Sequence, residues 1–251
     1  MTTYKAKDLD LQKLGLNDDL VISRNLSYQD LVLDIVNNGE GHIASSGAAM
    51  IDSGKYTGRS PKDKYIVDET SSNDKIWWGE VNQKISEKIF NKLYSQVINY
   101  YNNSKTKTYM FDGFAGAEKA YNLSVRFLVK KAWQAHFVNN MFIRPEPNQL
   151  NDFSADFTII NASDVKNLDY KIHGMNSESF VIFHLEKKIA IIGGTEYGGE
   201  MKKGIFSVLH YILPQKGVLS MHCSANVDNL SLIHISEPTR PLYISYAVFC
   251  L

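Results

Sequence analysis

The chain has 251 residues, of which 44% are hydrophobic and 12% aromatic, enough to bury the core of one large domain or two small ones. Lys plus Arg and Asp plus Glu both number 27, and this zero net charge gives no indication of nucleic acid or a membrane as a partner. The N-terminus lacks the pattern of a signal peptide, and no apolar run approaches the ~20 residues that cross a bilayer. Cys223 and Cys250 form neither a CxxC pair nor a disulfide framework, so we expect a reducing, cytoplasmic setting.

Apolar periodicity predicts helices and strands that interleave along the chain. Helices are expected over residues 28–38, 80–101, 132–143 and 199–213. Strands are expected over residues 48–52, 63–69, 107–113, 124–129, 156–163 and 218–227, with a hairpin over 179–194 that turns at residues 186–188. Because the strands and helices do not follow a regular βαβ order, we expect an α/β fold with a mixed sheet.

The segment SGKYTGRSPKDKY, residues 53–65, holds Arg59 between Gly58 and Ser60-Pro61. The glycine lets the backbone bend, and the proline stiffens the chain after the arginine. A guanidinium presents paired donors that match a carboxylate or a phosphate. Neither this segment nor the rest of the chain contains GxxxxGK followed by Ser or Thr, so it is not a Walker A loop. An anion-binding arginine and an ordinary charged surface turn both remain open.

The segment GGTEYGGEMKKG, residues 193–204, places Lys202 and Lys203 near the start of a predicted helix. The dipole and free N–H groups of a helix start favour an anion rather than a cation. Adjacent residues on a helix project about 100° apart, so the two ammonium groups cannot do the same job. We interpret them as contacting different parts of one anionic ligand. The alternative is a solvated helix start, in which Glu200 pairs with Lys203.

His222 lies in VLSMHCSANV, residues 218–227, on the polar face of the strand predicted there. A lone histidine is more often structural than a ligand, so this position alone does not indicate a metal site. The other histidines have no carboxylate or cysteine at ligand spacing and are interpreted as structural. They are His42, His136, His173, His184, His210 and His234.

Four blocks of the sequence together resemble the ATP-dependent phosphoenolpyruvate carboxykinases: TGRSPKDKYIVDE, WQAHFVNNMFIRP, IGGTEYGGEMKKGIFSVLHYILPQKG and SMHCSANV. The blocks follow the family's order, and the resemblance runs from about residue 15 to Val227. It implies that residues 1–227 form the N-terminal, substrate-side domain of that fold. It also implies the family's reaction, a step of gluconeogenesis, in which oxaloacetate and ATP give phosphoenolpyruvate, CO2 and ADP. The family's cofactors are Mg²⁺ with ATP and Mn²⁺ in the protein.

Carried over residue by residue, the resemblance implies that Arg59 holds the substrate carboxylate and that Tyr197 contacts substrate or CO2. It implies that Lys203 and His222 bind Mn²⁺, that His222 also approaches the γ-phosphate, and that Lys202 faces the substrate or the transferring phosphoryl group. A lysine ligates a metal only as a neutral amine, so the pKa of Lys203 is expected far below its usual ~10.4. The dication and the Lys202 ammonium both lower it.

After Val227 the sequence departs from the family. Residues 230–240, LSLIHISEPTR, resemble the translation of a transposase adapter used in sequencing libraries. We therefore expect residues 228–251 to be a non-native tail on a truncated gene, and the nucleotide-binding C-terminal domain to be missing. The chain alone is then expected to be inactive. A divergent natural tail is the alternative for this segment. The alternative function is a non-catalytic module that binds a dicarboxylate or a phosphate.

Overall fold

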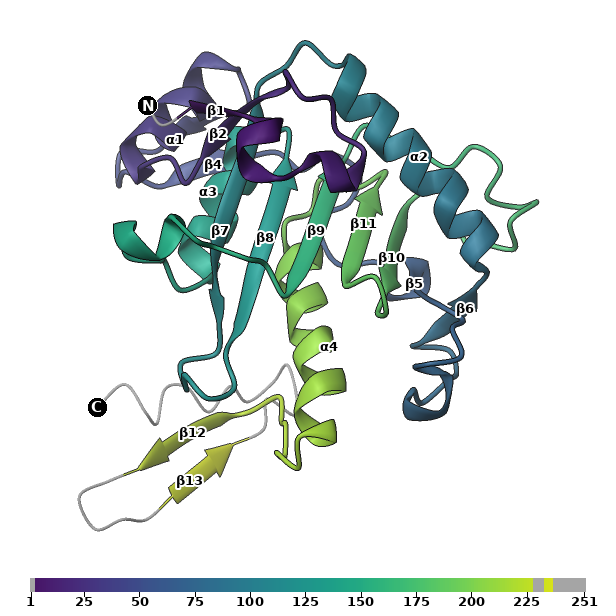
Figure 1. Ribbon diagram of the computed structural model, residues 1–251. Coiled ribbons are helices and arrows are strands. Elements are labelled where there is room, and N and C mark those ends of the chain that lie inside the picture. Colours follow the sequence, from purple (N-terminus) through teal and green to yellow (C-terminus); the bar gives the residue numbers. More distant parts are fainter. Residues whose placement is uncertain (1–2, 228–232, 237–251) are drawn as a thin grey trace. The chain divides into compact units, whose positions relative to one another are not determined.

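The computed structural model describes the backbone of residues 3–227 and 233–236, and the side chains as far as residue 223. The chain forms two compact units, Met1–Val208 and Leu209–Leu251. The first unit is built on one mixed sheet (Figure 1), which confirms the predicted α/β fold class. None of the helices in the described ranges has the length and apolar character needed to span a bilayer.

Within the described residues, the sheet of the first unit has nine strands in the order β1-β2-β7-β8-β9-β11-β10-β5-β6. The pairs β1–β2, β7–β8 and β10–β11 are antiparallel, and the other neighbours are parallel. The strands are β1 (Thr3–Lys5), β2 (Val21–Arg24), β5 (Lys64–Val67), β6 (Gln83–Ile85), β7 (Thr108–Ala115), β8 (Leu123–Val129), β9 (Phe157–Ala162), β10 (Phe180–His184) and β11 (Ile189–Gly193). Two further antiparallel pairs stand apart from this sheet: β3 (Gly41–Ile43) with β4 (Ala49–Ile51), and β12 (Ser224–Val227) with β13 (Ile233–Ser236).

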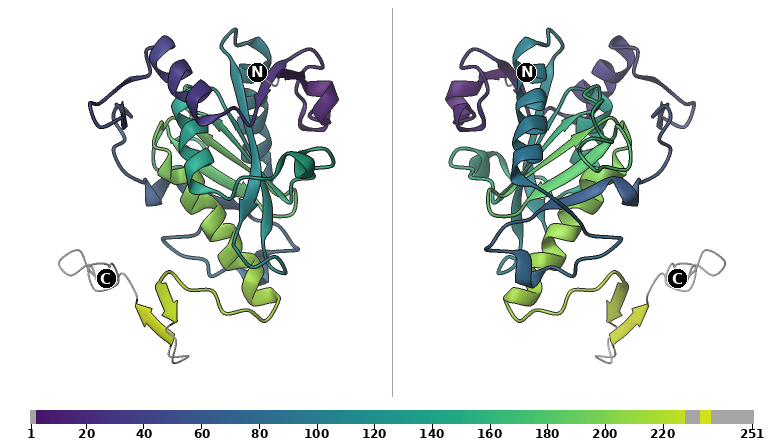
Figure 2. Two further views of the ribbon diagram at one scale, coloured as in Figure 1. Left: turned by 90° about the vertical axis from the view of Figure 1, so that its left-hand side faces the viewer. Right: turned by 90° about the vertical axis from the view of Figure 1, so that its right-hand side faces the viewer.

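Helices cover both faces of the sheet. The α-helices are α1 (Tyr28–Asn37), α2 (Glu87–Asn103), α3 (Ala132–Met141) and α4 (Gly199–Gln215), and α4 runs from the first compact unit into the second. Short 3-10 turns occur at Ala6–Leu9, Gln12–Leu14, Pro61–Asp63, Asn73–Lys75 and Pro147–Leu150. Helix α2 crosses one face of the sheet, and α1 and α3 lie on the opposite face (Figure 2).

The core forms where the apolar stripe of α2 meets the sheet. Phe90, Leu93 and Val97 of α2 are fully buried, and they belong to one cluster with Ile160 of β9 and Ile191 of β11. Burying side chains of this size contributes about 1.5–3 kcal/mol each. This packing holds the parallel strands β9 and β11 in place, and the segment that follows β11 carries the residues of the candidate site.

The predicted start of the second helix is wrong. Residues 83–85 form β6 at the edge of the sheet, where Ile85 pairs with Val67 of β5. The helix begins after Ser86, whose side chain accepts the N–H of Ile89 as an N-cap. Ile85 keeps the four-residue apolar spacing of the helix, so periodicity alone did not separate it from α2.

The strand predicted over residues 218–227 is also too long. Helix α4 ends at Gln215, and Gly217 follows with a φ of 74°, in the left-handed region that glycine tolerates. Of residues 218–227, only residues 224–227 pair with another strand in the described part of the chain, as β12 with β13. His222 therefore lies in a bend before β12, and it is not on a strand face.

Candidate functional site

One pocket of the first compact unit brings together four of the residues that the sequence singled out. Its volume is about 350 Å³. It is lined by Ile51, Ser53, Arg59, Trp133, Phe137, Met141, Tyr197, Gly198, Gly199, Lys202 and Lys203. These residues come from three segments far apart in the sequence: the turn before β5, helix α3 and the start of α4. The pocket thus has three cationic side chains on one part of its wall and an apolar surface on another.

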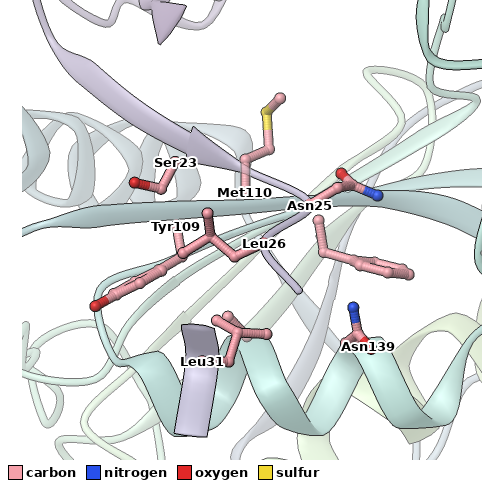
Figure 3. Close-up of a pocket in the computed structure, with 9 residues that line it drawn as sticks. Ser23, Asn25, Leu26, Leu31, Tyr109, Met110 and Asn139 are labelled. Carbon is pink, nitrogen blue, oxygen red and sulfur yellow. The ribbon is translucent and has the colours of Figure 1, made fainter. Parts of the chain in front are cut away.

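Two other hollows in the described residues are less suited to an anionic ligand. The cavity between α1, α3 and strands β2 and β7 has a volume of about 10 Å³, room for about one water molecule. Figure 3 shows Leu31 and Asn139 on the helix side of this cavity, and Tyr109 and Leu26 on the opposite side. A larger surface hollow near the end of α2 includes Lys107, but that lysine is paired with Asp34 at 2.6 Å.

The Arg59 segment is an irregular turn between β4 and the 3-10 turn Pro61–Asp63. Arg59 itself is exposed, as a residue that meets a ligand from solution must be. The backbone N–H of Ser60 donates to Oε1 of Glu200 in α4 at 2.7 Å. This bond joins the Arg59 segment to the first turn of the helix that carries both lysines.

Tyr197 is positioned by the chain on both sides of it. Its N–H donates to the Thr195 hydroxyl at 3.2 Å. The preceding residue, Glu196, is ion-paired with Lys131 at 2.9 Å, and its carbonyl accepts from the Gln134 side chain. The Tyr197 ring lies so close to Gly199 that a Cβ added there would overlap it. An alanine at position 199 would fit only if the Tyr197 ring moved.

The apolar wall of the pocket comes from α3. Trp133, Phe137 and Met141 are four residues apart and so share one face of the helix. The helix start is held by Glu40, whose two carboxylate oxygens accept the N–H groups of Ala132 and Trp133 at 3.0 and 2.9 Å. A carboxylate at this position also complements the helix dipole. These three residues were not among the predicted site residues, although their four-residue spacing in the block WQAHFVNNMFIRP was a usable signal.

The two lysines differ in environment. Lys202 is exposed, whereas Lys203 is half-buried and its Nζ lies 4.8 Å from the centre of the Phe206 ring. Partial burial lowers the pKa of Lys203, and the charges of Arg59 and Lys202 lower it further. The direction is the one expected of an amine that binds a metal in its neutral form. Glu200, which the sequence spacing could have paired with Lys203, is buried, and its carboxylate accepts the Ser60 N–H.

Burial raises the pKa of Glu200, while the Ser60 N–H and the charges of Arg59 and Lys64 act in the opposite direction. Glu200 is thus a carboxylate that the fold has moved out of water and surrounded with donors and cations. From the sequence, Glu200 was interpreted only as a possible partner of Lys203. No local pattern links it to Ser60, which is 140 residues away.

His222 belongs to the second compact unit, so its expected convergence with Lys203 on one metal stays a prediction. Across the described residues, no three His, Cys, Asp or Glu side chains gather closely enough to hold a metal ion. Residues 230–240, which resemble adapter sequence, lie outside the described residues except for 233–236, the residues of β13.

Comparison with known proteins identifies the family of this chain. Residues 21–233 match the family model described as phosphoenolpyruvate carboxykinase. The chain is 57% identical over 217 residues to the phosphoenolpyruvate carboxykinase (ATP) of Leptospira biflexa, covering 86% of this chain and 40% of the relative. It is 49% identical to the enzyme of the same name from Campylobacter lari, covering 86% of this chain and 41% of the relative. The Bacillus cereus (strain AH187) enzyme is 49% identical over 202 residues, covering 80% of this chain and 38% of the relative.

The chain spans about two fifths of the length of these curated relatives (40%, 41% and 38%). The blocks of sequence around Arg59, Trp133, Tyr197 and Lys203, which the fold brings to one pocket, all fall inside the matched region. The chain belongs to the family of ATP-dependent phosphoenolpyruvate carboxykinases.

Proposed function

We propose that this chain is the substrate-binding part of an ATP-dependent phosphoenolpyruvate carboxykinase that acts in gluconeogenesis. In that reaction oxaloacetate loses CO2, and the resulting enolate takes the γ-phosphoryl group of ATP to give phosphoenolpyruvate and ADP. The observation that carries the proposal is the pocket in which Arg59 faces the same space as Lys202 and Lys203.

Each pocket residue has a proposed role that the family resemblance implies and that its side-chain chemistry suits. The Arg59 guanidinium holds a substrate carboxylate through paired N–H donors. Tyr197 contacts the substrate or the CO2 that leaves it. The Lys202 ammonium stabilises negative charge as it develops on the enolate or the transferring phosphoryl group. The apolar wall at Trp133 and Phe137 excludes water, and charges interact more strongly in the lower dielectric that results.

One side chain of this site, Lys203, has the chemical character of a ligand for a divalent cation. The pKa of Lys203 is lowered by burial and by the neighbouring Arg59 and Lys202, which favours the neutral amine that a metal requires. We propose that Lys203 would be a ligand of Mn²⁺ and that Mg²⁺ would enter with ATP. A Mn²⁺ ion held by this amine would supply a Lewis acid for a substrate oxygen.

Turnover is proposed only for the whole enzyme. These 251 residues contain no GxxxxGK followed by Ser or Thr, the pattern that cradles nucleotide phosphates in the Walker A loop. We therefore expect the chain alone to bind phosphoenolpyruvate without converting it. Joining the chain to the remaining part of a relative should restore turnover. Binding without turnover in that fusion would indicate a non-catalytic anion-binding module instead.

The test is a calorimetric titration of the chain with phosphoenolpyruvate. Arg59→Ala should raise the Kd at least about tenfold, because a hydrogen bond to a charged group contributes about 1.5–3 kcal/mol. Arg144→Ala is the matched control, since Arg144 is exposed, lies outside the pocket lining and, among the described residues, bonds to Asn139 and Asn140 of its own region. An Arg59→Ala variant that binds as tightly as the Arg144→Ala variant would contradict the proposal.

A further inference from the structure

Glu200 lies in α4 between the lining residues Gly199 and Lys202 and is not itself part of the pocket lining. The residue is 7% exposed. Carboxylates are rarely buried to this degree unless partners satisfy them. Here the partner is the backbone N–H of Ser60, the residue after Arg59, at 2.7 Å. A short bond between a charged acceptor and an N–H is among the stronger hydrogen bonds in proteins.

The Arg59 segment has little else to hold it. Residues 53–60 contain no helix or strand. Within the described part of the chain, the other hydrogen bonds of residues 53–60 stay between residues 52 and 63. An irregular turn with only internal bonds has many conformations of similar energy. The Ser60–Glu200 bond is therefore the contact that can select one of them.

Charged side chains near the Ser60–Glu200 hydrogen bond affect the pKa values of Lys203 and Glu200. Partial burial is the main cause that lowers the pKa of Lys203, and the nearby charges of Arg59 and Lys202 lower it further. Burial likewise raises the pKa of Glu200, whereas the charges of Arg59 and Lys64 favour its ionised form. Glu200 thus lies close to the cationic side chains that the Ser60 bond brings together.

We propose that Glu200 is the positioning residue that holds the Arg59 segment against the start of α4, so that the guanidinium faces the same ligand as Lys202 and Lys203. Glu200 does not touch the substrate. It acts through the backbone of Ser60, and its effect on ligand binding rests on the function proposed above for the pocket.

The first measurement is hydrogen exchange of the Ser60 amide by NMR, which needs no ligand. Glu200→Met removes the acceptor and the charge but keeps a side chain of similar length that suits a buried helical position. It should speed exchange at Ser60 at least about tenfold, the effect of losing one charge-assisted hydrogen bond. Glu200→Gln keeps an acceptor oxygen but loses the charge, so it should speed exchange less than Glu200→Met does.

Two control variants distinguish the loss of the Ser60–Glu200 hydrogen bond from general effects of a substitution on the fold. Glu118→Met removes another carboxylate that accepts a backbone N–H, that of Ala120 at 3.2 Å, at a place outside the pocket lining. Ser60→Ala removes the hydroxyl and leaves the N–H that makes the bond. Glu118→Met should retain the wild-type exchange rate at residue 60, and Ser60→Ala should retain the wild-type protection factor there.

The second measurement is the Kd for phosphoenolpyruvate. Glu200→Met should raise it about tenfold, and Glu200→Gln should restore most of the affinity. Unchanged Ser60 exchange in Glu200→Met would overturn the inference, and so would a Glu200→Gln variant as weak as Glu200→Met. Failure of the wild-type chain to bind, or normal binding by Arg59→Ala, would instead overturn the proposed function and leave the Ser60 result standing.

Discussion

At the scale of single residues, the site depends on how little space Gly199 occupies. The Tyr197 ring packs against the Gly199 backbone, and any β-carbon at that position would overlap the ring. Gly198 is different, because a Cβ there would meet Phe137 and Trp133 at 3.1 Å, a distance that small side-chain movements can relieve. The two neighbouring glycines therefore differ in which side chain a substitution would displace: a side chain at position 199 would displace the Tyr197 ring, and one at position 198 would not.

We predict that Gly199→Ala weakens phosphoenolpyruvate binding about tenfold, because the methyl group pushes the Tyr197 ring out of place. Overpacking of this kind costs about 1–3 kcal/mol. Gly79→Ala is the control, because a Cβ there meets nothing within 4 Å and the position lies outside the pocket lining, so it should bind like wild type. Calorimetry on both variants gives the affinities, and thermal melts report whether each is folded. Equal affinities in the two variants would show that Tyr197 does not depend on the glycine.

At the scale of elements, the end of β8 carries a buried charge that the site does not use. The Lys130 Nζ donates to the Thr106 carbonyl at 3.1 Å and to the Thr108 hydroxyl at 2.8 Å. It also lies 5.0 Å from the centre of the Tyr101 ring. Burial lowers the pKa of Lys130 to about 8 from 10.5. Keeping Lys130 charged therefore lowers the free energy of unfolding, and this loss of stability disappears when the amine is neutral.

The sign of the pH effect follows from proton counts. Between pH 8 and 10.5 the unfolded chain binds more protons at Lys130 than the folded chain, so the free energy of unfolding rises with pH in this window. Below pH 8 both states are protonated and the slope vanishes. We predict that the wild-type chain gains stability over this window relative to Lys130→Met. Urea unfolding of both proteins at pH 7.5, 9 and 10 measures the difference. Parallel curves for the two proteins would contradict the prediction.

At the scale of the whole molecule, the family match and the compact units divide the chain differently. The first unit ends at Val208 inside α4, whereas the family match continues to residue 233. The resemblance to adapter sequence begins at Leu230, so we propose that the native sequence ends near Val227. Residues 228–251 are then sequence that no selection has fitted to this domain.

We predict that deletion of residues 228–251 leaves the melting temperature unchanged, although it removes β13, the partner of β12. A loss of about 1 kcal/mol would lower the Tm of a domain this size by about 2–4 °C, which a thermal melt resolves. A decrease of several degrees would show that the tail is a structural element of the protein. Neither form of the chain is expected to turn over oxaloacetate.

Much of the fold could be predicted because it depends on local patterns. Alternation placed β8, β9 and the hairpin of β10 and β11 within a residue or two, and the turn at residues 186–188 was correct. One error, the start of the second helix, came where the apolar spacing of a helix continues into a neighbouring strand. Ile85 fits the stripe of α2, yet it pairs with Val67, because the edge of the sheet offers it backbone partners as well as burial. The strand predicted around His222 failed because most of that segment pairs with no other strand in the described part of the chain.

The sequence by itself determined the family, the α/β class and the chemical character of the site. Glycine and proline around Arg59, and adjacent lysines at a helix start, are local features that residue types express directly. Only the tertiary structure decided that Arg59 shares a pocket with Lys203 and that Glu200 binds Ser60 across 140 residues. The physical reason is that local preference depends on near neighbours in the chain. A buried carboxylate is instead satisfied by whichever donor the packed elements bring to it, and no spacing in the sequence records that donor.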